Sequence, residues 1–582
     1  MLQSLSIPLA QASGTWLTVW LTPIWFLAVG IAFGMAALAV LMLLFRILSA
    51  IPAWSKLSES PAGHAMAAGL TLALAGGVWF SLPPEAKGSS DINEPLLLGI
   101  ALVLLFALVG WSLVFCSSKR SAKANWSVLT EGAAGYLSLS GLTIVAIGGA
   151  VWAISAVSPS PLVADPAAAF ASIPQVFSTG KSTFPVTIPG SSDEFVPVPL
   201  EIDFDLLDSL EIQTDRAIVL GDAADSAEFN RVPIKLGASE SVRWTRGQRL
   251  EELPVPYEET ELLHVQNKEL DQATLTFTLK TSPPVPQASS FLITAIAVML
   301  IGLAILLQQG VAPRVSAVAH ATVKNELAQP LFLVLMLLGL VAIILYEFLS
   351  FNTFGEDIKL LKDCGITTIM LLAAFQGIWS ASSSISEEIE GKTALTILSK
   401  PIQRRSFVIG KFMGIFWVLL LMFVILGAIE LFAVSYKPIY DARENSESAP
   451  TWQLCHVEMM RTIPGLAMAF MQSVVLTAIS VALATRLPQL ANLSVCFAVY
   501  VIGNLTTSLV SSTQGGFEIV KFVANLVATV IPILEHFSLQ AAIDAGNPIT
   551  MSLLSGNLIY CLLYVLLSMF LALLLFEDRD LA

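Results

Sequence analysis

Charged residues are scarce in this chain of 582 residues. Asp, Glu, Lys and Arg make up only 13% of it, against about 25% in ordinary soluble domains. Hydrophobic residues make up 55%, and the mean hydropathy is +0.75. So few charges cannot cover a water-soluble globule of this size. The composition therefore predicts a membrane protein, with enough length for many spans and one soluble domain.

Cysteine and histidine are also rare, with five of each. The cysteine spacings match no disulfide framework and no zinc or haem motif, so we expect no metal site. No basic residue precedes the first apolar run, which argues against a cleavable secretory signal. The net charge of −14 excludes a generally basic nucleic-acid binder.

Two common catalytic motifs are missing as well. The sequence has no Gly-x-x-x-x-Gly-Lys-Ser/Thr phosphate loop and no Gly-x-Ser-x-Gly nucleophile elbow. We therefore expect no enzymatic activity and no cofactor in this chain.

Long apolar runs dominate what remains. A helix needs about 20 mostly apolar residues to cross a hydrocarbon layer about 30 Å thick. The apolar stretch 519–541 is broken by Lys521, Pro532 and Glu535, so we predict an interfacial or re-entrant segment there. We predict eleven spans: Pro23–Phe45, Ala62–Leu82, Leu96–Cys116, Gly135–Val157, Phe291–Leu307, Leu331–Ser350, Gly365–Ser384, Phe412–Ser435, Ile463–Ala484, Leu490–Val510 and Leu554–Phe576.

The basic residues indicate the orientation. Lysines and arginines follow the first, third, fifth, seventh and ninth spans, as with Arg46, Lys119 and Arg486. Because cytoplasmic loops are enriched in these residues, the N-terminus is predicted outside and the C-terminus inside the inner (cytoplasmic) membrane.

One polar insert, residues 158–290, separates the fourth and fifth spans and falls outside the membrane. It contains 20 acidic and 9 basic residues, so it carries −11 of the total charge. Runs such as Ile202–Leu206 and Leu275–Leu279 alternate with the period of half-buried strands, and no sustained helical stripe appears. We predict an extracytoplasmic, β-sandwich-like domain.

The loop between the seventh and eighth spans is the most informative segment. It begins with three glutamates, continues with an apolar ridge that includes Leu395 and Leu398, and ends with basic residues around Pro401. This order predicts a short amphipathic helix on the membrane surface. The ridge could bind a cytosolic partner, or the loop could be a simple connection facing anionic lipid headgroups.

The residue order in this loop resembles the signature of type-2 ATP-binding-cassette (ABC) exporter permeases, with the closest likeness to copper-processing and gliding-motility systems. Three further segments resemble that family: Ala321–Pro330 its interfacial helix, Ile531–Phe537 its proline-containing stretch, and Phe576–Leu581 its charged ending. The resemblance covers residues 313–582, which hold six spans.

The resemblance implies a coupling helix that docks on a separate ABC ATP-binding subunit, where ATP-Mg is bound. It also implies a homodimer or pseudo-dimer of permeases in the lipid bilayer. The residues implied to couple to the ATPase or to start the following span are Glu388, Glu390, Gly391, Thr393, Leu398, Pro401, Arg404, Gly410 and Lys411.

Two pairs of residues leave alternatives open. Glu347 and Glu430 near predicted outer span ends could line a substrate or proton path, although interfacial placement is the favoured interpretation. Cys364 and Cys455 are predicted in outer loops, where they could form a disulfide, although free thiols are favoured. His456 and Glu458 are expected in the same exposed loop as Cys455.

The sequence thus predicts an all-α polytopic membrane protein of about eleven transmembrane helices with an inserted β-domain. The expected organisation is a four-helix N-terminal region (1–157), the β-domain (158–290), a fifth span with a linker (291–312) and a six-helix permease domain (313–582). The expected function is the permease subunit of an ABC exporter, driving substrate export or an extracytoplasmic conformational change. The alternative is a non-transporting membrane anchor or assembly protein that displays the β-domain.

Overall fold

The structure of the chain is a computed structural model. It describes residues 15–58, 60–81, 93–190, 194–198, 204, 206–225, 229, 231–249, 252–255, 263–349, 357–387, 403–512, 518–538 and 551–577. The chain divides into two compact units, which are described separately. A β-rich unit takes in Val163–Leu292, and a helical unit takes in Thr15–Leu162 together with the chain from Ile293 onward.

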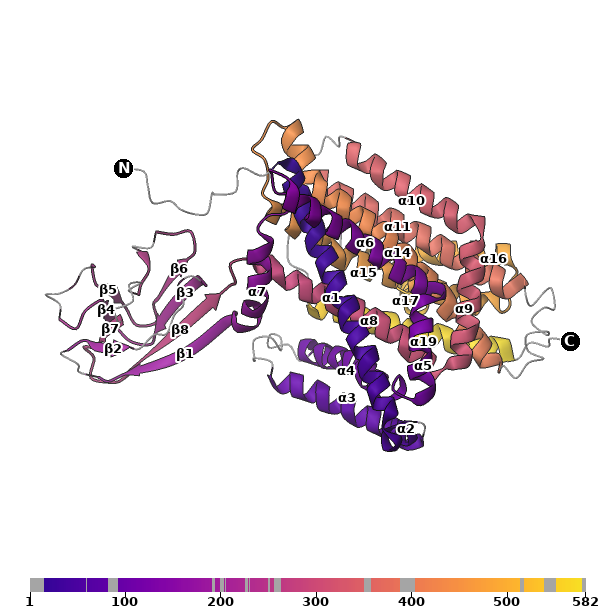
Figure 1. The fold of residues 1–582 in the computed structure, drawn as a ribbon, viewed down its shortest axis with the longest axis horizontal. Helices are drawn as coiled ribbons and strands as arrows, with labels where there is room; N and C mark the ends of the chain where they lie inside the picture. Colours follow the sequence, from indigo (N-terminus) through magenta and orange to yellow (C-terminus); the bar gives the residue numbers. More distant parts are fainter. Residues whose placement is uncertain are drawn as a thin grey trace. The chain divides into compact units, whose positions relative to one another are not determined.

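Ten helices in the described residues are long and apolar enough to cross a membrane (Figure 1). They confirm the predicted class of polytopic helical membrane protein with an inserted β-domain. These helices are α1 (Trp16–Ala50), α3 (Pro61–Ser81), α4 (Asn93–Phe115), α6 (Gly132–Val157), α8 (Ser289–Val311), α10 (Pro330–Phe348), α14 (Arg404–Glu444), α15 (Trp452–Ala484), α16 (Gln489–Ser512) and α19 (Met551–Glu577).

An eleventh long helix, α11 (Asp357–Ala381), contains most of the seventh predicted span but carries more polar residues. It packs against α10, α14 and α15. Two of its glycines let neighbours approach closely, because a Cβ atom on Gly365 would overlap the Glu430 carboxylate and one on Gly377 would overlap Thr477. A helix surrounded by other helices needs less apolar surface than one facing lipid.

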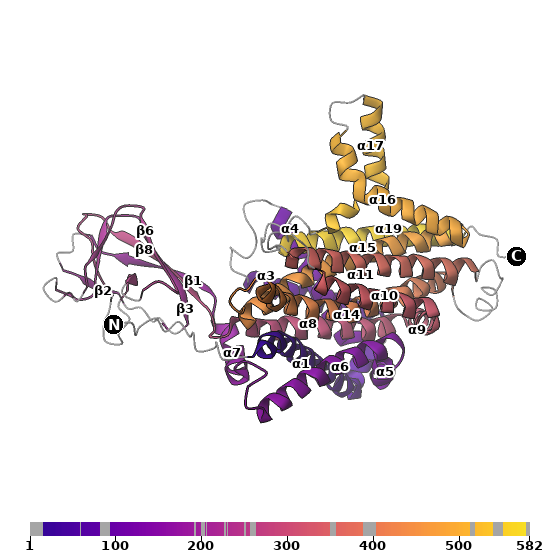
Figure 2. The ribbon, with the colours of Figure 1, turned by 90° about the horizontal axis from the view of Figure 1, so that it is seen from above.

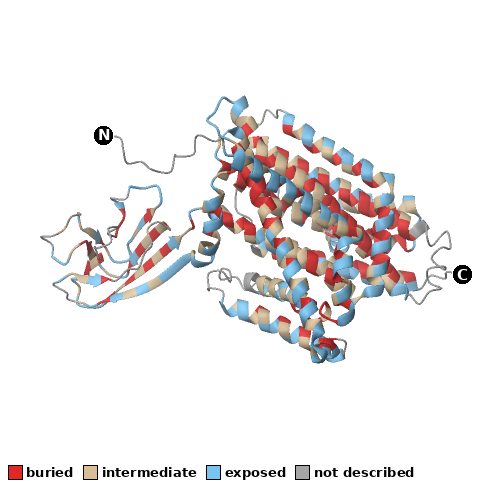
Figure 3. Cartoon of the chain, viewed as in Figure 1, coloured by how far each residue is buried: buried red, intermediate tan, exposed pale blue. Residues whose placement is uncertain are grey.

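Helices α14 and α15 form the centre of the helical unit. The most apolar stretch of α14 is 61% buried and that of α15 is 67% buried. The corresponding values for the spans before α10 are only 11–33%. Figure 3 shows the buried residues concentrated in this central part, and the peripheral helices expose one side. The exposed apolar faces fit contact with lipid.

Shorter elements connect the long helices: α2 (Pro52–Ser58), α5 (Lys119–Thr130), α9 (Pro313–Ala328), a π-helix η5 (Ser382–Glu387), α17 (Glu518–Val530) and a 3-10 helix η6 (Leu534–Phe537). Pro330 starts α10 directly after α9, as expected of proline at the first position of a helix. Helix α17 lies beside α16 (Figure 2) and has 13 residues. Its length of about 20 Å is too short for a full span.

The β-rich unit contains two antiparallel four-stranded sheets, ordered β1-β8-β3-β6 and β2-β7-β4-β5. Both sheets contribute to one hydrophobic core, which is the sandwich arrangement that the alternating pattern predicts. The strands are β1 (Lys181–Ile188), β2 (Val196–Val198), β3 (Leu207–Thr214), β4 (Ile218–Gly221), β5 (Ile234–Leu236), β6 (Ser241–Thr245), β7 (Leu263–Gln266) and β8 (Ala273–Thr281).

Strand β8 shows how the alternation builds this core. Leu275, Phe277 and Leu279 are buried, and the Phe277 ring stacks on Phe184 of β1 at 5.4 Å between centroids. Residues 202, 203 and 205 of the other predicted run lie outside the described residues. The unit also contains α7 (Pro166–Ser178), a helix that the strand pattern did not predict.

Candidate functional site

Most of the predicted coupling residues fall in the segment 388–402, outside the described residues. They are Glu388, Glu390, Gly391, Thr393, Leu398 and Pro401. The structure does describe both flanks, since η5 ends at Glu387 and α14 begins at Arg404. At the second flank, the Arg404 guanidinium donates a hydrogen bond of 3.1 Å to the carbonyl oxygen of Glu577 at the end of α19. Arg404 thus joins the start of α14 to the last helix.

Gly410 forms a close contact between helices. A Cβ atom on Gly410 would lie 2.6 Å from Cβ of Val318 in α9, and one on Gly414 would lie 2.6 Å from Cβ of Thr322. Small residues spaced by four let two helices approach closely. Lys411, between them, is buried, with its ammonium 5.6 Å from the centre of the Phe407 ring. The predicted interfacial helix α9 therefore packs on the first turns of α14.

A buried polar network lies next to η5. The Glu326 carboxylate of α9 accepts hydrogen bonds from the Ser380 hydroxyl and, at 3.5 Å, from the Gln376 amide of α11. Asn492 of α16 donates to the hydroxyls of Ser382, at 2.7 Å, and Ser480, at 2.9 Å. These bonds hold α9, α11, α15 and α16 together directly before segment 388–402.

A second group of polar residues lies at the other end of α11 and α14. Lys362 of α11 forms a buried ion pair with Glu458 of α15. Lys437 of α14, fully buried, pairs with Asp441 one turn later at 3.0 Å. Glu458 was expected in an exposed loop, and Lys362 lies before the predicted seventh span. Helices α11, α14 and α15 are longer than their apolar cores, and the turns towards one end of each helix carry these charges.

Glu347 and Glu430 belong to this second group, and both are buried. Glu347 is 5% exposed and Glu430 is 0% exposed, which the favoured interfacial interpretation did not anticipate. Within the described residues, none of their four carboxylate oxygens has a hydrogen-bond partner. The Glu430 carboxylate packs on the backbone of α11 at Gly365.

The sequence pattern did not indicate that four of these residues lie together. They are Lys362, Lys437, Asp441 and Glu458. Hydropathy assigned Lys362 and Glu458 to loops, and the predicted eighth span ended at Ser435, before Lys437 and Asp441. The helix signal was present, because Lys437 and Asp441 have the i,i+4 spacing of a helical ion pair.

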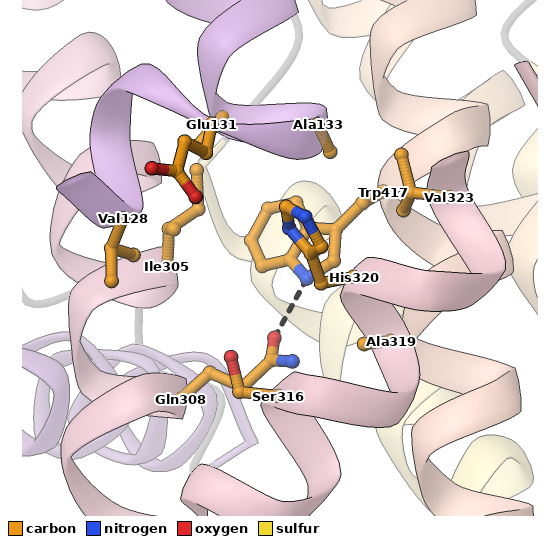
Figure 4. A pocket seen from close by; sticks show the side chains of 11 residues that line it. Val128, Glu131, Ala133, Ile305, Gln308, Ser316, Ala319, His320, Val323 and Trp417 are labelled. Carbon is orange, nitrogen blue, oxygen red and sulfur yellow. Dashed lines mark hydrogen bonds between the residues drawn. The ribbon is translucent and has the colours of Figure 1, made fainter.

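A small pocket of about 50 Å³ lies between α9 and the N-terminal helices (Figure 4). The Trp417 indole donates a hydrogen bond of 2.7 Å to the Gln308 side chain at its wall. Gly132, with a φ of 62°, sits where a side chain would collide with the His320 ring. Sites for drug-sized ligands have volumes of about 300–1,000 Å³. This pocket can hold a few water molecules and is too small for such a substrate.

All five cysteines are described, and all are free thiols. The structure therefore records Cys364 and Cys455 as thiols, and the disulfide between them stays a prediction. Both residues lie in helices instead of loops, because α11 and α15 extend beyond the predicted spans. His456 is likewise buried in α15, where its ring meets Phe26 edge-to-face at 5.4 Å. The exposed-loop interpretation of residues 455–458 was wrong.

Residues 350–581 match the model of a family described as ABC-2 family transporter protein. No curated protein matches the chain. The matched range contains α11, both flanks of segment 388–402 and the helices from α14 to α19. It also contains Lys362 and Lys437, the two lysines of the second polar group. It begins after α10, so the resemblance to permeases seen for residues 313–349 lies outside it. The match supports an ABC-2-type permease in the C-terminal part of the chain.

Proposed function

We propose that this chain is the permease subunit of an ABC exporter and that a separate ABC subunit binds and hydrolyses ATP with Mg²⁺. The observation that carries this proposal is the ABC-2 family match over residues 350–581, which includes the coupling signature. The narrower likeness to copper-processing and gliding-motility permeases rests on the sequence around that signature.

Segment 388–402 is the proposed contact with the ATPase. It connects η5 and α14, and each flank is attached to other helices through Ser382 or Arg404. A displacement imposed on the segment would therefore pass to α16 and α19. Such a connection is what a permease needs to convert ATP-driven motion into movement of its spans.

The proposed arrangement has two permease copies and two ATPases in the inner membrane. The chain would begin outside and end in the cytoplasm, with the β-rich unit extracytoplasmic. A single cysteine introduced by Leu270→Cys would then react with a membrane-impermeant maleimide in intact cells, since Leu270 is 90% exposed. A cysteine from Lys400→Cys would react only after permeabilisation. The reverse labelling pattern would contradict this orientation.

Copurification with co-expressed candidate ABC ATPases tests the coupling proposal. We expect the native chain to retain one ATPase and to alter its hydrolysis rate. Leu398→Asp would weaken both effects, because it puts a charge on the predicted apolar docking ridge. Leu270→Asp makes the same chemical change on an exposed part of the β-rich unit and should have no effect.

Normal copurification and stimulation by Leu398→Asp would refute the assigned docking surface. Failure to recover any ABC ATPase, with no ATP-dependent phenotype, would favour the alternative of a non-transporting membrane anchor that displays the β-rich unit.

A further inference from the structure

The second group of polar residues lies near one end of α10, α11, α14 and α15 and has more acids than bases. Its acids are Glu347, Glu430, Asp441 and Glu458, and its bases are Lys362 and Lys437. Its two lysines are both used in ion pairs, Lys362 with Glu458 and Lys437 with Asp441. Glu347 and Glu430 remain without an ion-pair partner among the described residues. The group therefore has two carboxyl groups for which it supplies no matching cation.

Both remaining carboxyl groups are shielded from bulk solvent by the surrounding helices. Glu430 is completely buried and Glu347 is 5% exposed. The described residues donate no hydrogen bond to either. An isolated carboxylate in such surroundings is so costly that the group normally becomes neutral by taking up a proton. Protonation removes that cost without requiring a cavity.

The surrounding charges do not remove the need for a proton. Glu347 interacts electrostatically with Lys437, but also with Asp441, the carboxylate already paired to that lysine. Glu430 interacts with Lys362, which is hydrogen-bonded to Glu458, and also with Glu347 itself. Two nearby carboxylates disfavour ionisation of each other.

Other ionisable groups lie around this charged group, and of these Cys364 interacts electrostatically with Glu430. They are Asp357 and Cys364 of α11, Tyr440 and Glu444 of α14, and His456 and Arg461 of α15. Arg461 is 57% exposed and pairs with Glu458 at 3.6 Å. In the described residues, no three His, Cys, Asp or Glu side chains form a group that could hold a metal ion. A proton is thus the ligand that this geometry fits.

We propose that Glu347 and Glu430 are a proton-binding pair, each protonated while the helices are packed as in this structure. The Glu430 carboxyl is enclosed where α14 meets α11 at Gly365. Separation of these helices would admit water there. The O–H bond of the acid would then break, the proton would pass to water, and a hydrated carboxylate would remain. Opening of the bundle at this end is therefore accompanied by proton release.

Infrared spectroscopy of the full chain in liposomes tests the pair and needs no ATPase, so its result is independent of the proposed function. At neutral pH, a protonated carboxyl group has a carbonyl stretching band that a carboxylate lacks, and this band shifts in D₂O. We expect this band in the native chain. Glu430→Gln and Glu347→Gln should each remove part of it, and the double variant should remove both contributions.

The matched control is Glu444→Gln, which makes the same change at an exposed site on α14. It should leave the acid band unchanged. Glutamine has nearly the shape of protonated glutamate, so we also expect the variants to insert and to retain the thermal midpoint of the native chain. If the double variant does not insert, the two single variants carry the test. An acid band that neither single substitution changes would overturn the proposal.

Discussion

A buried glutamate lies against each end of α11, and the groups of α11 that contact the carboxylate differ between the two ends. At the end next to η5, α11 presents Gln376 and Ser380, whose side chains donate hydrogen bonds to Glu326 of α9. At the other end it presents Gly365, whose backbone lies against Glu430 of α14. Both glutamates are fully buried.

This difference shows that burial alone does not define the role of an intramembrane acid. Where donors surround it, the carboxylate can fasten helices together, as Glu326 does beside the predicted coupling segment. Where a glycine faces it, the carboxyl group gains no stabilisation from its neighbour and requires a proton or a counter-ion. The donor end thus fits the proposed coupling to the ATPase, and the glycine end fits the proposed exchange of a proton.

The largest effect is expected from Glu458→Ala at the glycine end. It leaves the buried ammonium of Lys362 without its ion-pair partner, which typically costs about 3–5 kcal/mol. The free energy of unfolding in mixed micelles would measure the loss. Glu444→Ala, at an exposed site, should change it by less than about 0.5 kcal/mol. A cost below about 1 kcal/mol for Glu458→Ala would show that Lys362 turns to Glu430, so the two ends would differ less than proposed.

A smaller loss is expected from Gly410→Ala near the donor end. The new Cβ would meet Val318 of α9, and overpacking of this kind costs about 1–3 kcal/mol. Gly149→Ala on α6 is the control, because no atom lies within 4 Å of its added Cβ. That control should be neutral or stabilising by up to about 1 kcal/mol. Equal effects of both substitutions on the unfolding free energy would mean that α9 does not depend on Gly410.

Hydropathy in the sequence predicted the long helices and the alternation of β8, but not where α14 ends or where α15 begins. Windows that search for apolar residues stop where Lys437, His456 and Glu458 appear. These residues are nevertheless buried or partly buried in helices, because ion pairs and ring contacts replace hydration. Partners from other helices, such as Lys362 for Glu458, cannot be inferred from one local sequence. Gly365 could not be recognised as the neighbour of Glu430 for the same reason.

The donor end can be probed more gently with Asn492→Ala. This change removes the hydrogen bonds to Ser382 and Ser480 and should cost about 1 kcal/mol in unfolding free energy. Its larger expected consequence is functional, since Ser382 belongs to η5. Stimulation of the partner ATPase should fall while copurification persists. Asn525→Ala, at an exposed site on α17, is the control. Unchanged stimulation in Asn492→Ala would separate this network from coupling.

The smallest effect is expected from an ion pair outside the helical unit. Arg216 contacts Glu269 at 3.2 Å and Asp271 at 3.0 Å on the surface of the β-rich unit. The hydrogen bond to Glu269, followed by the charge of Asp271, raises the pKa of Arg216. Because water screens these exposed charges, Glu269→Gln should leave the thermal midpoint unchanged. If it lowered the midpoint as much as Glu458→Ala, then burial would not be what makes the Lys362–Glu458 pair important. Buried and exposed ion pairs would then contribute equally to the stability of the molecule.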